Sequence, residues 1–129
     1  QLQSSAASDV YKRQYDKLLT VFSNLIDNAI KYSNDGKNIY VKSQNSEGKL
    51  IGKNMLINIK DEGIGIPQDL IPRITERFFR VDTEKSKKVG GTGLGLAIMK
   101  HIIAQHRGDY EILSKINDGT EIKIYLPTN

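Results

Sequence analysis

The chain has 129 residues, of which 38% are hydrophobic and 26% charged, and this predicts one compact domain and excludes a disordered or fibrous protein. It has no cysteine, which excludes disulfides and thiolate metal sites, and no apolar run approaches the roughly 20 residues of a membrane-spanning helix. The net charge of +4 suits phosphorylated ligands, but no basic stripe interleaved with aromatic residues indicates nucleic-acid binding.

The first half of the chain predicts a helix followed by a hairpin. Residues 1–13 are small and polar without a period, which predicts a disordered tail or sequence foreign to the natural domain and leaves 14–129 as that domain. Over about 15–32, apolar residues recur at helical spacing and predict an amphipathic helix. Two strands follow, at about 39–44 and 55–61, and predict a hairpin with a long polar connection.

The second half predicts two more helices and a second hairpin. Pro67 suits the first turn of a short helix, and the charged residues 77–90 lack a period and predict a long loop. A strong helix is predicted at about 94–105, and two closing strands at about 110–115 and 121–126. This order predicts an α+β fold, a two-layer α/β sandwich whose mixed, mostly antiparallel sheet is covered on one face by about three helices.

The predicted first helix carries a row of polar side chains on the face opposite its apolar stripe. At about 100° per residue, Asn24, Asn28 and Lys31 fall within an arc of roughly 60° opposite that stripe, and Tyr32 lies at the border. Two amides and an ammonium in one row are able to hold a hydrated Mg²⁺ ion and a phosphate, because Mg²⁺ prefers oxygen ligands and keeps much of its water. The alternative is the ordinary solvent face of an amphipathic helix.

The segment DEGIGI stands at the end of the second predicted strand. Asp61 leaves the sheet with its position fixed by the strand, and Gly63 and Gly65 permit close approach of a flat ligand. A carboxylate in an apolar pocket accepts a hydrogen bond from an exocyclic amine, which favours adenine over guanine. An ordinary turn is the alternative.

The run GGTGLGL, residues 90–96, leads into the second strong helix. Its glycines allow successive amide N–H groups to face one ligand, and the helix N-terminus adds partial positive charge, so the run predicts a polyphosphate site. No Gly-Lys-Ser/Thr follows, as a P-loop requires, and no parallel strand-helix-strand unit frames it, as a dinucleotide fingerprint requires. A glycine loop that serves only tight packing is the alternative.

The order and spacing of these segments are more specific than any single one. NLIDNAIKY, DEGIGI, RFFRVD and GGTGLGLA resemble the N, G1, F and G2 boxes of the catalytic ATP-binding domain of bacterial sensor histidine kinases, in the wider group that includes gyrase B, Hsp90 and MutL ATPases. The resemblance runs from about Tyr15 to Pro127 and implies the Bergerat ATP-binding fold, with ATP between the first helix and a lid. The family's short strand before that helix has only a poor counterpart, ASDVYKRQ.

The resemblance implies a role for each matching residue. Asn28 would coordinate Mg²⁺ with help from Asn24, and Lys31 would reach phosphate, so Asn28 and Lys31 are the expected catalytic residues. Asp61 would accept from the adenine amine, and Tyr32 would line the nucleotide. The remaining nucleotide contacts are expected from Gly63, Gly65, Ile66, Arg80, Gly91, Thr92, Gly93, Leu94, Gly95 and Thr120. In the lid, Phe78 and Phe79 would form an apolar anchor.

The function implied by the resemblance is transfer of the γ-phosphoryl group of ATP-Mg to a histidine on a separate dimerisation domain of the same kinase, with a response regulator downstream. Neither His101 nor His106 is followed by the acidic residue of the family's acceptor motif, so the acceptor is expected outside this chain. The resemblance further implies a monomeric, cytoplasmic domain of a membrane-anchored sensor kinase.

Two alternatives use the same fold differently. An ATPase of the gyrase or Hsp90 type carries a glutamate as general base one helical turn before the magnesium asparagine, but here that position is Asn24, whose amide has no useful basicity. A non-catalytic nucleotide-binding or interaction module would be favoured by the loss of Asp61 or Asn28, and both are present. The sequence therefore favours phosphoryl transfer over both alternatives.

Overall fold

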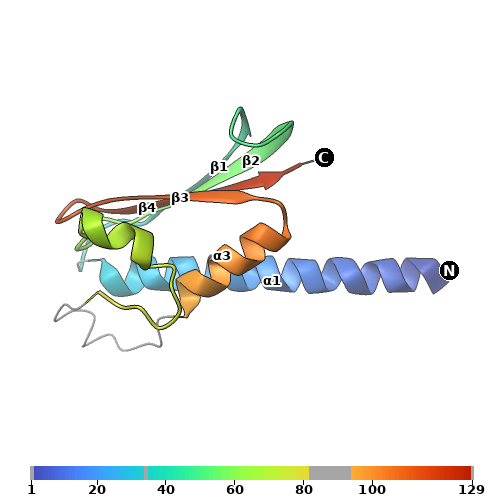
Figure 1. The fold of residues 1–129 in the computed structure, drawn as a ribbon, viewed down its shortest axis with the longest axis horizontal. Coiled ribbons are helices and arrows are strands. Elements are labelled where there is room, and N and C mark those ends of the chain that lie inside the picture. Colours follow the sequence, from blue (N-terminus) through green and yellow to red (C-terminus); the bar gives the residue numbers. More distant parts are fainter. Residues whose placement is uncertain (1, 34, 82–93, 129) are drawn as a thin grey trace.

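The computed structural model describes residues 2–33, 35–81 and 94–128, which form two layers (Figure 1). One sheet has the strand order β1-β2-β4-β3, and α1 and α3 lie along one of its faces. The elements are α1 (Leu2–Tyr32), β1 (Tyr40–Glu47), β2 (Lys53–Lys60), the 3-10 helix η1 (Gln68–Arg73), α3 (Gly95–Gln105), β3 (Asp109–Lys115) and β4 (Gly119–Pro127). The predicted α+β sandwich is confirmed, although every strand pair in the described part is antiparallel, so the sheet there is not mixed.

The hydrophobic core lies between the two helices and the sheet. Leu25 of α1, Met99 of α3 and Ile124 of β4 are each no more than 1% exposed. The spacing of apolar residues explains this burial, because residues three or four apart share one face of a helix and alternate residues share one face of a strand. The buried core comprises Val21, Leu25, Ala29, Ile59, Met99, Ile102, Ile103, Ile122 and Ile124.

Helix α1 begins much earlier than its apolar period. Residues 2–13 are helical, so they are not the disordered tail that was one of the two predictions for them, whereas the other, sequence foreign to the natural domain, stays a prediction. Leu18 is the first residue that packs against the core, and the helix before it projects beyond the sheet (Figure 1). Residues 9, 10 and 12–17 are exposed and need no apolar period, and Ala, Gln, Lys and Arg in this stretch favour helical backbone. Although α1 has 31 residues, none of the helices described here is apolar enough to cross a bilayer.

The connection between the first two strands and the short helix after β2 are shorter or tighter than predicted. The pairs from Asn45↔Met55 to Glu47↔Lys53 belong to the β1–β2 ladder, so the connection is residues 48–52 instead of the expected 45–54. Cross-strand pairing outweighs the low strand propensity of Asn and Ser there. The short helix predicted to begin at Pro67 is the 3-10 helix η1, which contains Pro72 and ends at Arg73. A proline inside it removes one backbone donor, which is consistent with its short length.

The tip of the β1–β2 hairpin folds over the sheet face opposite the helices. Lys49 Nζ lies 5.6 Å from the centre of the Tyr125 ring and 3.4 Å from Glu111 Oε1. The Tyr125 hydroxyl donates to the same Glu111 oxygen at 2.9 Å. Leu56 and Tyr125 are consequently buried on the face opposite α1 and α3. The cavity described next lies on the other side of the sheet.

Candidate nucleotide-binding cavity

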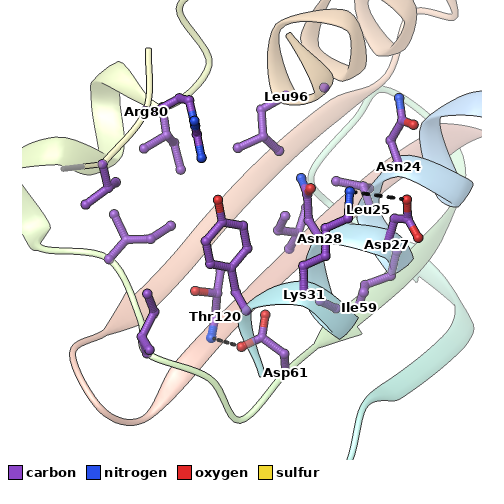
Figure 2. Close-up of a pocket in the computed structure, with 18 of the residues that line it drawn as sticks. Asn24, Leu25, Asp27, Asn28, Lys31, Ile59, Asp61, Arg80, Leu96 and Thr120 are labelled. Carbon is purple, nitrogen blue, oxygen red and sulfur yellow. Dashed lines mark hydrogen bonds and ion pairs between the residues drawn. The ribbon is translucent and has the colours of Figure 1, made fainter. Parts of the chain in front are cut away.

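A cavity of about 410 Å³ opens between α1, the segment after β2, the segment after η1, the N-terminus of α3, and β4 (Figure 2). This volume is within the range of sites for small molecules. Its two ends differ: the buried end carries Asp61, Gly65 and Thr120, and the exposed end carries Asn24, Asp27, Asn28 and Lys31. Between them the lining is mostly apolar and comprises Leu25, Ala29, Ile59, Ile64, Ile66, Ile74, Phe79, Val81, Leu94, Leu96, Ile98 and Ile122.

Sheet register brings Asp61 and Thr120 together at the buried end. Lys60 pairs with Glu121 at the last position of the β2–β4 ladder, so the residues just beyond lie side by side. The Asp61 amide donates to the Thr120 carbonyl at 2.9 Å, and the Thr120 amide donates to Asp61 Oδ1 at 3.1 Å. Gly63 N also donates to Oδ1, at 2.9 Å. Both amides thus bind one carboxylate oxygen, and the other faces the cavity (Figure 2).

The backbone around Asp61 leaves no room for side chains at two glycines. A Cβ on Gly63 would lie 2.2 Å from the Tyr32 carbonyl oxygen, because Gly63 bridges to Ser33 at the end of α1. Gly65 has a φ of 74°, and a Cβ there would lie 2.1 Å from the Lys115 carbonyl oxygen. Both distances are far below van der Waals contact. Glycine is therefore required for the close packing of this segment between α1 and the β3–β4 hairpin.

A hydroxyl pair fixes the segment after Gly65 to the β3–β4 hairpin. Ser114 Oγ accepts from the amide of Ile66 at 2.8 Å and donates to the carbonyl of Gly119 at 2.9 Å. The Thr120 hydroxyl lies 2.7 Å from the same Ser114 oxygen. Gln68 extends this connection through a hydrogen bond from its side-chain amide to the Ser114 carbonyl. The floor of the buried end is thus held by side chains as well as by backbone.

Burial raises the pKa of the Asp61 carboxyl above its ordinary value, because removal from water disfavours the charged form. The hydrogen bonds from Gly63 and Thr120 act in the opposite direction, since they stabilise the carboxylate. A carboxylate held in this way is a strong acceptor for a donor that enters the cavity.

The exposed end is a row of polar side chains on α1. Asn24 and Asn28 are one helical turn apart, half-buried, and line the cavity. Lys31 Nζ lies 3.7 Å from Asp27 Oδ2, and both side chains are largely exposed, at 47% and 65% (Figure 2). Amide and carboxylate oxygens are hard ligands, so this end offers donors to a hydrated Mg²⁺ ion. No cluster of three or more histidine, aspartate or glutamate side chains that could hold a metal ion occurs among the described residues.

The N-terminus of α3 meets this polar row. A Cβ on Gly95 would lie 3.8 Å from Asn28 Nδ2 and 4.0 Å from Asn24 Cβ. The first intrahelical hydrogen bond of α3 runs from Ile98 N to Leu94 O, so the preceding amides of the helix have no partner within it. The amides at the start of α3, which have no partner within the helix, and the positive end of the helix dipole therefore face the end of the cavity that carries Asn24 and Asn28.

The segment after η1 closes a further side. Arg80 lines the cavity and lies across it from Asp61 in Figure 2. Phe79 lines the cavity too and packs beneath Arg73, whose guanidinium lies 4.5 Å from the ring centre. Phe78 is 69% exposed, so the expectation that it anchors the lid is wrong in this structure. The chain turns at Phe78, where φ is 65°, and of the two phenylalanines it is Phe79 that lines the cavity.

The structure brings most of the expected site residues into this cavity. Those that line it are Asn24, Asn28, Lys31, Tyr32, Asp61, Gly65, Ile66, Arg80, Leu94, Gly95 and Thr120. Gly63 is not among the lining residues, because it packs under Asp61 and against Tyr32. Gly91, Thr92 and Gly93 lie outside the described residues, as does most of the predicted loop 77–90.

Asp27 and Ser114 are the polar residues that sequence reasoning missed. Asp27 stands four residues before Lys31, and this spacing is a usable signal, because oppositely charged residues at i and i+4 meet on a helix surface. Ser114 lies 48 residues from Ile66, and only the sheet pairing brings them together. No local pattern could have identified it.

Comparison with known proteins agrees with this geometry. The family described as Histidine kinase-, DNA gyrase B-, and HSP90-like ATPase matches residues 13–129. The chain is 46% identical over 114 residues to the sensor protein kinase WalK of Staphylococcus haemolyticus, and 42% identical over 113 residues to the sensor histidine kinase WalK of Bacillus subtilis. Each alignment covers 87% of this chain and 18% of the relative, so the chain spans less than a fifth of their length.

Solved structures give the same result. The mycobacterial sensor histidine kinase MprB superimposes with a TM-score of 0.73 at 31% identity, over 87% of this chain and 70% of that one. The fold, the cavity and the order of the boxes around it therefore have one explanation: the chain belongs to the family of histidine kinase-, DNA gyrase B- and HSP90-like ATPases.

Proposed function

We propose that this domain binds ATP with Mg²⁺ and donates the γ-phosphoryl group to a histidine on a separate dimerisation domain of the same kinase, as a step in two-component signalling. The observation that carries the proposal is Asp61, a buried carboxylate with one oxygen fixed by two amides and the other facing the cavity. This arrangement suits an exocyclic amine such as that of adenine, because a guanine carbonyl in the same place would meet a second acceptor.

The exposed end supports the triphosphate part of the proposal. Asn28 and Asn24 offer amide oxygens to Mg²⁺, and Lys31 and the N-terminus of α3 offer positive charge to phosphates. Mg²⁺ would supply charge neutralisation on the phosphates. Phosphoryl transfer depends mainly on positioning and on such neutralisation, so no further catalytic chemistry is required of the chain.

Transfer is favoured over hydrolysis because, among the described residues, no carboxylate of the cavity stands where a general base would be needed. Asn24 occupies the position one turn before Asn28, and an amide does not activate water. Of the described residues that line the cavity, the carboxylates are Asp27, which pairs with Lys31, and Asp61, which lies at the buried end. Neither occupies the position one helical turn before Asn28, where a general base would stand. The acceptor histidine and a membrane anchor would belong to the rest of the parent kinase, and the response regulator would be a separate protein downstream. This domain, cytoplasmic and monomeric, would start near residue 14.

Two measurements test the proposal. Calorimetric titration with non-hydrolysable analogues of ATP and GTP in Mg²⁺ should give binding only for the adenine nucleotide. Incubation with labelled ATP and the separately purified acceptor domain of the parent kinase should then give an acid-labile phosphohistidine on that domain. Phosphate release at the same rate without the acceptor would favour the ATPase alternative. Absence of binding at millimolar nucleotide would favour the interaction module.

A further inference from the structure

Asp27 is a charged group at the exposed end to which the proposed function gives no role. It precedes Asn28, lines the cavity, and lies 3.7 Å from the ammonium of Lys31. Its side chain is 65% exposed, and an exposed i,i+4 ion pair on a helix adds little to stability. The ion pair alone therefore does not explain why a carboxylate lines this end of the cavity.

The pairing alters what the exposed end attracts. Among the described residues, the side chains assigned to this end are two neutral amides, one ammonium and one carboxylate, so their formal charges cancel. Lys31 alone would attract a polyphosphate whether or not the polyphosphate carried a metal ion. With Asp27 beside it, the anionic phosphates meet repulsion as well as attraction, and a divalent cation bound to them meets a nearby carboxylate. The sign of the contribution of Asp27 thus depends on the metal.

We propose that Asp27 is a specificity-determining residue that makes this cavity prefer the metal-bound nucleotide to the metal-free nucleotide. The inference rests on the proposed function, because it assumes a nucleotide whose phosphates occupy the exposed end. A triphosphate loses two units of negative charge when it binds Mg²⁺, so repulsion by Asp27 falls mainly on the metal-free form. Asp27 acts by excluding the wrong charge state, and Asn24 and Asn28 act by accepting the ion.

The test measures affinity by calorimetry for a non-hydrolysable ATP analogue, once with Mg²⁺ and once with a chelator, at low ionic strength. In Asp27→Asn, affinity for the metal-free analogue should rise about three- to tenfold, because one repulsive charge is removed. Affinity for the Mg²⁺ form should stay within about twofold, since lost attraction to the ion offsets lost repulsion of the phosphates. The ratio of the two affinities should therefore fall, and the fall should shrink in high salt.

Two variants control the experiment. Asp27→Glu keeps the charge and should keep the wild-type ratio. Asp16→Asn removes an equal charge from an exposed position of α1 that does not line the cavity, and should leave both affinities unchanged. A ratio in Asp27→Asn equal to that of the wild type would overturn the inference while leaving the proposed function intact. A wild type that binds the analogue in neither condition would overturn both.

Discussion

The two ends of the cavity are built in different ways. At the buried end, Asp61 Oδ1 accepts from two backbone amides, and Ser114 ties the floor to the β3–β4 hairpin. At the exposed end, the α1 side chains of the described residues form an ion pair between two exposed groups, Asp27 and Lys31. The buried end is therefore arranged before a ligand arrives, whereas the exposed end is completed by the charges that the ligand brings.

Glycine substitutions should show the largest difference between the two ends, measured as the change in the free energy of unfolding. Gly65→Ala would place a Cβ 2.1 Å from the Lys115 carbonyl oxygen at a φ of 74°, so the free energy of unfolding should fall by about 3 kcal/mol. Gly95→Ala meets its nearest atom at 3.8 Å, in a helix, and should leave stability unchanged or slightly higher. Urea denaturation of both variants measures the difference. Equal losses would show that the exposed end is packed as rigidly as the buried one.

Removal of the acceptor at the buried end should affect binding next most. In Asp61→Asn, the remaining side-chain oxygen is still able to accept from Gly63 and Thr120, while the amide that replaces Oδ2 presents a donor to the base. Affinity for an ATP analogue with Mg²⁺ should fall about a hundredfold, with little change in melting temperature. Calorimetry and thermal unfolding on the same samples distinguish the two effects. An affinity within about fivefold of the wild type would contradict the role of Asp61.

A substitution in the polar row of the exposed end should have a smaller effect that depends on the metal. Asn28→Ala should lower affinity for the analogue about tenfold with Mg²⁺ and hardly at all with a chelator, because it removes one ligand of the ion. Asn24→Ala, one turn further from Lys31, should show the same pattern more weakly. Equal losses with and without Mg²⁺ would mean that Asn28 contacts the nucleotide directly. Titrations in both buffers decide between these outcomes.

The smallest expected effect is a pH dependence of stability. Burial raises the pKa of Asp61 in the folded state above its ordinary value of 3.8. The folded state therefore holds this proton more tightly than the unfolded state, and the resulting stability is present below pH 3.8 and lost as pH rises through the raised pKa. Relative to Asp61→Asn, the wild type should lose stability over that interval and then level off. Urea titrations at a series of pH values measure it, and a difference that grows with pH would contradict the raised pKa.

The helices that form the core could be predicted from local spacing. Leu25 and Met99 belong to stripes in which apolar residues recur every three or four positions, and a stripe of that kind is buried wherever a sheet is available to cover it. Residues 2–13 and 45–47 were predicted wrongly for the opposite reason, since neither stretch has an apolar pattern. Helix propensity formed the first, and pairing with β2 formed the second.

The residues of the candidate site that could be predicted are those whose positions follow from a local sequence pattern. Asp61 stands at a strand end just before the turn-forming Gly63 and Gly65, and Asn24 and Asn28 share a helix face, so each position follows from local pattern. The partners of Asp61 do not, because Thr120 is 59 residues away and reaches it through the β2–β4 register. The Asp27–Lys31 pair stands between these cases, because its spacing was visible but its place in the cavity was not.

The β3–β4 turn is hydrogen-bonded to the segment after β2. This contact limits where residues can be inserted into the chain. Asn117 donates its amide to the carbonyl of Ile64 at 2.9 Å, and the turn thus fits between residues that shape the cavity floor. Hairpin tips usually tolerate insertions, and the tip at residues 48–52 meets that expectation, since Ile51 is fully exposed there. A peptide tag or a fluorescent reporter inserted at Ile51 would leave the cavity undisturbed, whereas the same insertion at Asn117 would displace its floor.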